Sequence, residues 1–481
     1  MNTRQSKKYK TGMGWICAIA VVCVSVPPPA FPATWTGGGP DANWSTAANW
    51  DTGPAPGDPA TEALIFEGTA KQSNNNDLGP GYFTDVTFQG GGFTINGATK
   101  LGISGNLTTA GDNAINTGLT LGGDGIRFIN GPVRGNLTID KGVDFHGLVL
   151  QDNTTGMTIL NGPFTGGGEL RIFSLGQMVL GGDNSDYDGV IKVFRFVKLS
   201  NEKALGGAST TVILDGSFEP AYVDLNGLNV SGVNVSFHVA KATDATARAR
   251  LRNTGAKAAA FCGNINLDAA GGVDGGGDMT LSGTIGGEGG DFVKEGVGTL
   301  RLTGANTFGT PRKSHGGTAA NTFSTGLEVK EGTLLANNRA GSASGNAPVR
   351  VAAGAAFGGT GSIATDLVLD RGLIAPGDKG IGALTVGGDT TWNAGEDCPW
   401  RFELGTGGAA DKLVVKGSFI KGTGKKFLFD FQKTGAPGTY PLVTFQRNRG
   451  FSASDFSCTN LPAGKTGTFF LTASQLSFVL K

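Results

Sequence analysis

Short alternations of apolar and polar residues dominate the chain from about residue 76. Residues 86–88, 119–121, 137–139 and 157–159 each place a threonine between two apolar side chains. This period of two is typical of a β-strand with one buried face and one wet face. Strands of three to five residues are not stable alone, so they must stack on one another. The pattern predicts an all-β fold coiled into a parallel β-solenoid, with roughly 20–25 residues per turn and turns about 4.8 Å apart.

An internal repeat supports the stacked arrangement. Residues 178–185 (Met-Val-Leu-Gly-Gly-Asp-Asn-Ser) match residues 300–307 (Leu-Arg-Leu-Thr-Gly-Ala-Asn-Thr), and both copies end in a Gly-x-Asn turn. Glycine permits a left-handed bend, and the asparagine amide can bond to backbone groups along the stack. Polar residues 310–324 follow the second copy, and we expect them to protrude as a loop.

Composition narrows the class of protein. Glycine is 83 of 481 residues, which is about 17% against a usual share of about 7%. Glycine disfavours helices but is well suited to turns, so many turns imply many short strands. With 39% hydrophobic and 16% charged residues, the chain can bury a core and does not have the composition of a disordered protein.

The charge balance gives no reason to expect a nucleic-acid partner. The first 33 residues hold four of the 39 basic residues and no acid, so the remainder has a net charge of −4. Arg248, Arg250 and Arg252 alternate with small or apolar residues. We interpret them as the wet face of one strand rather than as a phosphate-binding patch.

Residues 1–33 are typical of a secretory signal peptide. A basic start, Arg4 to Lys10, precedes the apolar run 15–26, which is too short to span a bilayer as a helix. Cleavage after Ala33 or Ala30 would release the mature chain, and a retained N-terminal anchor is the alternative. We therefore expect an exported protein, extracellular or on the outer cell surface, with no membrane span in the mature chain.

Three further regions follow the signal. Residues 34–75 contain Trp35, Trp44 and Trp50, which need apolar shelter and could cover one end of the solenoid. Residues 76–390 carry the repeating strands. Residues 391–481 are expected to form a β-rich cap, because an open solenoid end exposes an edge that recruits other chains. Its expected strands are 427–431, 439–445 and 467–471.

Five cysteines leave few pairing options. Cys17 and Cys23 lie in the signal, so Cys262, Cys398 and Cys458 remain and can form at most one internal disulfide. Cys398 and Cys458 share the C-terminal region and are the favoured pair. The alternative is three buried thiols.

The second copy of the repeat resembles a known family. Residues 296–309 read Gly-Val-Gly-Thr-Leu-Arg-Leu-Thr-Gly-Ala-Asn-Thr-Phe-Gly, and residues 329–335 read Val-Lys-Glu-Gly-Thr-Leu-Leu. This pattern resembles the autotransporter-associated β-strand repeat. The matching structural residues of the motif are Gly182, Asn184, Gly298, Leu300, Leu302, Gly304, Asn306, Phe308, Gly332, Pro376 and Gly377.

The resemblance implies a right-handed parallel β-helix with β-rich terminal caps, displayed at a bacterial cell surface. Only about 95 residues follow Val386, too few for the C-terminal barrel domain that such proteins carry with its linker, and the last residue is not aromatic. We therefore expect release outside the cell, or attachment through a partner, rather than self-translocation.

No motif of a known catalytic class is present. His146, His238 and His315 are far apart in sequence and match no metal-binding spacing, and residues 341–345 place alanine where a nucleophilic serine would stand. No cofactor is expected, with calcium left open at two places. Asn184, Asp186 and Asp188 resemble the start of an EF-hand loop, and Asp291 lies within residues 286–293, which fit the nonapeptide calcium motif once.

Two functional alternatives rest on surface residues. Asp183, Asp186 and Asp188 form the one dense acidic cluster, and Asp215 or Glu219 on neighbouring turns could join them in a polysaccharide lyase or hydrolase. Aromatic side chains in a line could instead stack on sugar rings, and the candidates are Tyr187, Phe194 and Phe196. Acids in polar turns are usually solvated, and phenylalanines in solenoids are usually internal.

We favour a secreted or cell-surface structural or adhesion protein, a non-catalytic solenoid scaffold, over an enzyme. Its expected partners are extracellular glycans or cell-surface components, and its oligomeric state is open. A polysaccharide-binding or polysaccharide-cleaving β-helix protein is the alternative.

Overall fold

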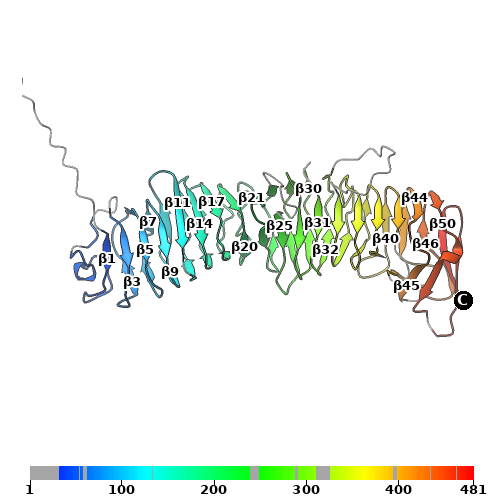
Figure 1. Ribbon diagram of the computed structural model, residues 1–481, viewed down its shortest axis with the longest axis horizontal. Coiled ribbons are helices and arrows are strands. Elements are labelled where there is room, and N and C mark those ends of the chain that lie inside the picture. The colour runs from blue at the N-terminus through cyan, green and yellow to red at the C-terminus, as the bar shows by residue number, and fades with distance from the viewer. Residues whose placement is uncertain are drawn as a thin grey trace, which may run out of the picture.

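The computed structural model describes residues 32–53, 55–57, 62–132, 134–238, 249–287, 291–309, 326–393, 398–433, 435–461 and 463–481. The chain forms a long rod in which short strands coil around a common axis and stack in parallel (Figure 1). Its N-terminal strand β1 lies at one end and its C-terminal strand β50 at the other. The predicted parallel β-helix is confirmed.

Three faces build the rod, and the first is a 12-stranded parallel sheet. Its strands are β1 (Ala33–Trp35), β2 (Leu64–Phe66), β5 (Val86–Phe88), β8 (Leu107–Thr109), β11 (Ile126–Gly131), β14 (Val149–Thr154), β17 (Glu169–Ile172), β19 (Val190–Val193), β21 (Thr211–Asp215), β24 (Val235–His238), β27 (Ile265–Leu267) and β30 (Ile285–Gly286).

After β30 the first face continues through turn residues. The backbone N–H of Thr307 donates to Ile285 O, and Asn306 and Ser342 form an isolated bridge. The six-stranded sheet that follows contains β37 (Ser362–Ile363), β40 (Ala383–Val386), β43 (Lys412–Val415), β46 (Gly438–Thr444), β50 (Gln475–Leu480) and β49 (Gly467–Leu471).

The second face is a stack of 17 strands in which each strand pairs in parallel with the next. They are β3 (Ser73–Asn76), β6 (Thr94–Gly97), β9 (Asn113–Ile115), β12 (Leu137–Ile139), β15 (Thr158–Leu160), β18 (Met178–Leu180), β20 (Phe196–Leu199), β22 (Ala221–Asp224), β25 (Ala249–Arg252), β28 (Gly271–Asp274), β31 (Phe292–Lys294), β33 (Leu327–Val329), β35 (Val349–Val351), β38 (Leu367–Leu369), β41 (Thr390–Trp392), β44 (Ser418–Lys421) and β47 (Arg447–Arg449).

The third face consists of three shorter sheets of five, seven and three strands. The first holds β4 (Tyr82–Phe83), β7 (Leu101–Ile103), β10 (Leu119–Leu121), β13 (Val143–Asp144) and β16 (Phe164–Thr165). The second holds β23 (Asn229–Val230), β26 (Ala259–Phe261), β29 (Met279–Leu281), β32 (Thr299–Leu302), β34 (Thr333–Ala336), β36 (Ala356–Gly359) and β39 (Leu373–Pro376). The third holds β42 (Trp400–Glu403), β45 (Phe427–Lys433) and β48 (Phe456–Thr459). Two short 3-10 helices, η1 (Ala47–Asn49) and η2 (Ala453–Asp455), lie in connections.

Inward-facing side chains form columns along the rod axis, because paired strands are in register. Successive members of one column are 20 to 30 residues apart in the chain. The central column of the first face is Leu64, Val86, Leu107, Ile129, Asp152, Ile172, Val193, Leu214, Phe237 and Leu267. All are buried, and Asp152 is the one charged residue among them.

The repeat residues have structural roles, and the two asparagines act in the same way. Asn184 accepts from the backbone N–H of Phe164 at 2.8 Å and donates to Ala204 O at 2.7 Å. Asn306 accepts from Ile285 N–H at 2.8 Å and donates to Ala343 O at 2.7 Å. Each amide therefore joins the preceding turn to the following one, as the repeat predicts.

The glycines of the two Gly-x-Asn turns are needed for close approach between turns. A β-carbon on Gly182 would collide with the carbonyl of Gly162, and one on Gly304 would collide with that of Gly283. Any other residue would force the neighbouring turns apart, so glycine is required by the stacking distance rather than by a site.

The N-terminal tryptophans close one end of the core, although the stacked strands already begin among them. Trp35 and Trp44 contact Trp50 edge to face, with ring centroids 5.2 and 5.8 Å apart. Trp44 Nε1 donates to Asn74 Oδ1 at 2.8 Å. β1, β2 and β3 all belong to the long faces, so residues 34–75 contain solenoid strands as well as the tryptophan cluster.

At the C-terminal end, only the last strands leave the parallel pattern. β50 pairs antiparallel with both β46 and β49, while β41 to β48 continue the three faces. Residues 391–481 therefore hold the final solenoid turns and an antiparallel end. The strands expected at 427–431, 439–445 and 467–471 coincide closely with β45, β46 and β49.

The predicted disulfide between Cys398 and Cys458 is wrong. Cys458 on β48 pairs with Phe429 on β45, which pairs with Trp400 on β42, two residues beyond Cys398. Two strand spacings of about 4.8 Å exceed the usual limit of about 7 Å between the α-carbons of a disulfide. No disulfide joins the three cysteines, of which Cys262 is exposed and the other two are half-buried.

Truncation after residue 390 tests the role of the C-terminal end. Removal of β41 to β50 leaves β38 and β40 as unpaired edges and uncovers apolar core. We expect the truncated chain to aggregate, because open strand edges recruit other chains. Size-exclusion chromatography of both chains after refolding is the measurement, and a soluble monomeric product would contradict the prediction.

Substitution of Asn306 by alanine tests whether the hydrogen bonds of its amide to the two adjacent turns stabilise the stack. The change leaves the buried Ile285 N–H and Ala343 C=O without partners, which costs about 2–4 kcal/mol locally. We expect a lower urea midpoint and faster hydrogen exchange at the Ile285 amide. Asn229→Ala, at an exposed strand end, is the control. Equal urea midpoints for the two variants would show that the Asn306 hydrogen bonds do not stabilise the stack.

Candidate functional site

The predicted acidic cluster lies on the turn between β18 and β19, and its residues alternate in direction. Asp183, Asp186 and Asp188 are exposed, whereas Asn184 and Tyr187 point into the core. Asp183 accepts a hydrogen bond from the Ser185 hydroxyl at 2.7 Å and pairs with Lys203 Nζ at 3.1 Å. The Ser185 hydroxyl and backbone N–H, followed by Lys203, lower the pKa of Asp183 to about 2. Asp183 is therefore held as a carboxylate and is not a proton donor.

The structure does not bring the expected additional acids to this cluster. Asp188 precedes β19, whereas Asp215 ends the neighbouring strand β21, so the two lie at opposite edges of the first face. Asp215 pairs with Lys192 at 3.3 Å, and Glu219 lies 3.9 Å from Arg195. The acids are thus bound in separate ion pairs, and the predicted pair of converging carboxylates does not form among them.

The residues proposed to bind calcium do not come together around one point among the described residues. The Asn184 amide is buried and bonds to backbone groups of the two adjacent turns, whereas Asp186 and Asp188 are exposed, so these three side chains do not face one another. Asp291 accepts from the backbone N–H of Gly326 at 2.7 Å, and residues 288–290 of its motif lie outside the described residues. Within the described ranges, no three His, Cys, Asp or Glu side chains are grouped closely enough to hold a metal ion.

The histidines do not assemble a site either. His146 contacts Tyr82 and Asp144 on the third face, with Nδ1 3.2 Å from the tyrosine hydroxyl. His238 ends β24 on the first face, and His315 falls outside the described residues.

Tyr187 is a core residue, so its expected role as a sugar platform is wrong. Its ring lies 5.5 Å from those of Phe145 and Phe164, and its hydroxyl donates to Gly168 O at 3.0 Å. Burial raises the pKa of this hydroxyl far above its usual value of 10.0. The tyrosine fills the interior at a turn where the third face has no strand.

Phe194 and Phe196 do lie at the corner between the first and second faces, but both rings are stacked on neighbouring turns. Phe194 lies 3.9 Å from Phe173 with nearly parallel planes, and Phe196 lies 5.1 Å from Tyr222. One face of each ring is therefore covered by an aromatic ring of a neighbouring turn. Phe218, which sequence reasoning missed, is the most exposed aromatic of this corner at 76%.

Arg250 and Arg252 lie on the outward side of β25, as expected for a wet strand face. Arg252 makes two hydrogen bonds of 2.6 and 2.8 Å to Asp274, and Arg250 Nη2 lies 2.6 Å from Glu295. Both charges are neutralised by carboxylates of the same face, which leaves no phosphate-binding patch there. Arg248 lies outside the described residues.

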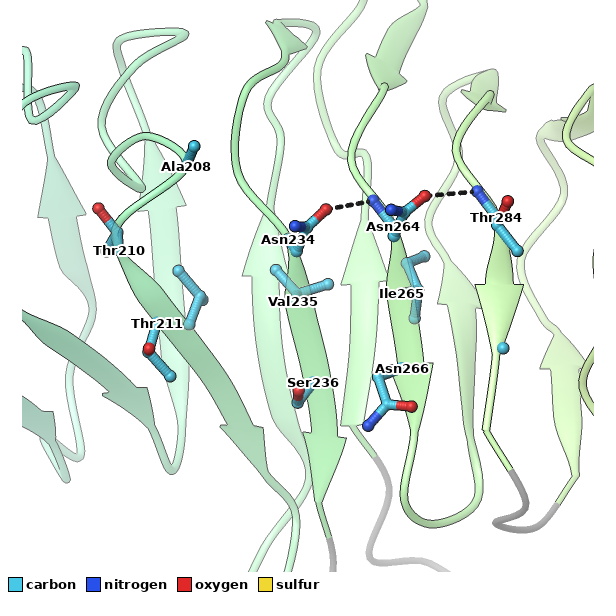
Figure 2. Close-up of a pocket in the computed structure, with 12 residues that line it drawn as sticks. Ala208, Thr210, Thr211, Asn234, Val235, Ser236, Asn264, Ile265, Asn266 and Thr284 are labelled. Atoms are coloured by element: carbon cyan, nitrogen blue, oxygen red, sulfur yellow. Dashed lines mark hydrogen bonds between the residues drawn. The ribbon is translucent and has the colours of Figure 1, made fainter. Parts of the chain in front are cut away.

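A polar groove hollows the outer side of the first face across β21, β24, β27 and β30 (Figure 2). Its volume is about 680 Å³, which is within the range of small-ligand sites. We call it the Asn/Thr groove. Its lining is Ala208, Thr210, Thr211, Val212, Asn234, Val235, Ser236, Asn264, Ile265, Asn266, Thr284 and Gly286.

The groove exists because outward side chains shrink along one column. In register, Arg171 and Lys192 are followed by Ile213, Ser236 and Asn266, and then by Gly286. Long charged side chains fill the face above β17 and β19, whereas short uncharged ones leave it open beyond β21. The groove is therefore formed by small outward side chains on an otherwise continuous sheet.

A short asparagine ladder fixes the edge of the groove. Asn264 N–H donates to Asn234 Oδ1 at 2.8 Å, and Thr284 N–H donates to Asn264 Oδ1 at 2.9 Å (Figure 2). Each bond holds an amide plane in a set orientation. The sequence offers no signal for this site, since its members are 20 to 30 residues apart and each looks like an ordinary turn or strand residue.

One buried carboxyl has strongly altered acidity. Asp152 is fully buried in the central column, and burial raises its pKa from 3.8 to about 6. Opposing this, the Thr154 N–H and the Thr158 hydroxyl donate to Oδ1 at 3.3 and 3.2 Å. Oδ2 makes no hydrogen bond to the described residues. The folded chain therefore binds this proton more tightly than the unfolded chain does.

Comparison of the chain with protein-family models and with curated proteins finds no match. In the part of the chain that the structure describes, no helix has the length and apolar character to cross a membrane.

Asp152 makes stability depend on pH. Its folded pKa lies above its unfolded pKa, so its contribution is present below about pH 4 and is lost as pH rises through about 6. The loss is up to about 3 kcal/mol, because one pKa unit is about 1.4 kcal/mol. Asp152→Asn removes this titration, and we expect it to stabilise the chain at pH 7 but hardly at pH 4.

Urea unfolding of the wild type and Asp152→Asn at pH 4, 5, 6 and 7 measures this effect. Asp186→Asn, at the exposed turn, is the matched control. A constant difference between Asp152→Asn and wild type across this range would show that Asp152 does not titrate there.

Proposed function

We propose that this chain is an exported, non-catalytic solenoid rod with a structural or adhesive role outside the cell or at its outer surface. The observation that carries the proposal is the unbroken second face, in which 17 strands stack from β3 to β47. Sixteen spacings of about 4.8 Å give a rod of roughly 75–80 Å. Such an extended body suits spacing and display better than enclosure of a substrate.

The distribution of charge supports a scaffold. Arginine and lysine side chains on the outer faces pair with carboxylates of adjacent turns, as Arg252 does with Asp274 and Arg301 with Asp278. These bonds run along the axis and reinforce the stack. In the predicted acidic cluster, Asp183 is paired with Lys203, and the acids expected to join it, Asp215 and Glu219, are paired with Lys192 and Arg195 instead.

Residues 1–33, most of which lie outside the described residues, and the repeat motif support the remaining parts of the proposal. In residues 1–33, a basic start followed by an apolar run favours export. The repeat motif at residues 296–309 resembles the autotransporter-associated β-strand repeat. A location at a bacterial cell surface is what that resemblance implies.

A second candidate function is polysaccharide binding, which the Asn/Thr groove favours. Its lining contains hydroxyl and amide groups and no carboxylate. Binding is therefore better supported than cleavage, which needs an acid and a base at the reacting bond.

Small-angle scattering combined with a turnover assay tests the proposal. We expect the scattering of an elongated particle and no new reducing or unsaturated ends from a panel of polysaccharides. A compact particle would contradict the rod. Product formed by the wild type but not by Asp186→Asn or Asp188→Asn would contradict the non-catalytic role and make the acidic turn an active site.

A further inference from the structure

We propose that the Asn/Thr groove binds a neutral, hydroxyl-rich glycan chain laid along the rod axis. This inference rests on the proposed adhesive function and names its ligand class and its site. The groove crosses four strands, so its floor is roughly 14 Å long at about 4.8 Å per strand spacing. A short stretch of an oligosaccharide fits that length.

The groove presents polar groups that the protein does not use. The hydroxyls of Thr211, Ser236 and Thr284 and the amide nitrogens of Asn234 and Asn264 make no hydrogen bond to the described residues, and Figure 2 shows them spread along the strands. Sugar hydroxyls both donate and accept hydrogen bonds, so they can pair with hydroxyls and amides alike.

The two asparagine amides are oriented before any ligand arrives. Their Oδ1 atoms accept backbone N–H groups from the next turn at 2.8 and 2.9 Å, which fixes the direction of each Nδ2. Asn266 is held in another way, since its Nδ2 donates to Asp268 Oδ1 at 2.7 Å. Little side-chain entropy is then lost on binding, and preorganisation of this kind raises affinity.

The absence of charge in the lining selects a neutral ligand. No Asp, Glu, Lys, Arg or His side chain is among the lining residues. The cations on the two preceding strands of this face are already paired, Arg171 of β17 with Glu169 at 2.9 Å and Lys192 of β19 with Asp215 at 3.3 Å. A uronic acid or a phosphate would lose hydration in the groove and find no counter-charge.

A protein partner fits the groove less well than a glycan. Three of the apolar lining residues, Val212, Val235 and Ile265, face inward and are at most 2% exposed, so the exposed apolar side chain of the lining is the small one of Ala208. No aromatic residue lines the groove, whereas the centres of protein interfaces are enriched in aromatic and apolar side chains. The groove therefore offers hydrogen-bonding groups with only small methyl groups between them, a combination that points to a polyhydroxyl ligand.

Binding of the full mature chain to a panel of neutral glucans, mannans and xylans, alongside matched uronic-acid polymers, tests the inference. We expect binding to at least one neutral polymer and not to the acidic ones. Ser236→Arg places a long charged side chain in the groove and should weaken binding roughly tenfold or more. Ser236→Ala, which removes one hydroxyl without filling the groove, should weaken it about threefold.

Two arginine substitutions outside the groove serve as controls. Thr280→Arg changes an outward mid-strand position of β29 on the third face at the same level of the rod. Thr138→Arg fills a smaller cavity of about 340 Å³ on the second face. Both should bind the glycan as the wild type does, and circular dichroism with scattering confirms that every variant keeps the rod.

Several outcomes would overturn the inference. They are no binding to any neutral polymer, preference for acidic polymers, unchanged binding by Ser236→Arg, or equal loss in Thr280→Arg or Thr138→Arg. The inference would also be overturned if the wild type bound no glycan but Ser236→Arg lost surface adhesion, because the groove would then hold a protein. An elongated, non-catalytic, adhesive rod that binds no neutral glycan refutes the groove assignment alone, whereas a compact or catalytic particle refutes the proposed function.

Discussion

The hydrogen-bonded register between successive turns is the constraint on which this structure depends. Because parallel strands pair residue by residue, each inward side chain lies directly against its equivalent on the next turn. A column must then be apolar throughout or must compensate each exception locally. Asp152 is such an exception in the first face, and the nearby threonine hydroxyls only partly offset its burial. The Gly-x-Asn turns satisfy the same constraint at the corners, where glycine allows contact and asparagine supplies the missing bonds.

Much of the fold could be predicted because its signals are local. Alternation at residues 86–88, 119–121 and 137–139 gave strands that the structure places at the same residues. The extent of the stack could not be predicted, since the first strand of the second face reads Ser-Asn-Asn-Asn. Two of those asparagines are buried, and Asn74 accepts a hydrogen bond from a tryptophan of the N-terminal cluster. A polar strand that is sheltered by tertiary contacts has no hydrophobic period to detect.

The functional surface was harder to predict than the fold. The acidic turn at residues 183–188 is conspicuous in the sequence, yet two of its residues, Asn184 and Tyr187, point into the core, and Asp183 is committed to Ser185 and Lys203. Tyr187 was wrongly expected at the surface, because a single sequence does not show which side of a turn faces the core. The groove has the opposite character. Ser236 and Asn266 are unremarkable residues 30 positions apart, and only the register of β24 and β27 places them side by side.

The length of the connections is independent of the register they join. Residues 310–325, which include the expected loop 310–324, lie outside the described residues, yet the strands on either side keep their register: Phe292 pairs with Leu327 and Leu300 with Leu334. This connection therefore accepts additional residues while the paired strands on either side of it keep their register. Related chains can therefore differ in the sequence of this connection while their stacked strands stay the same. The same connection offers a position for grafting foreign epitopes onto a rigid support.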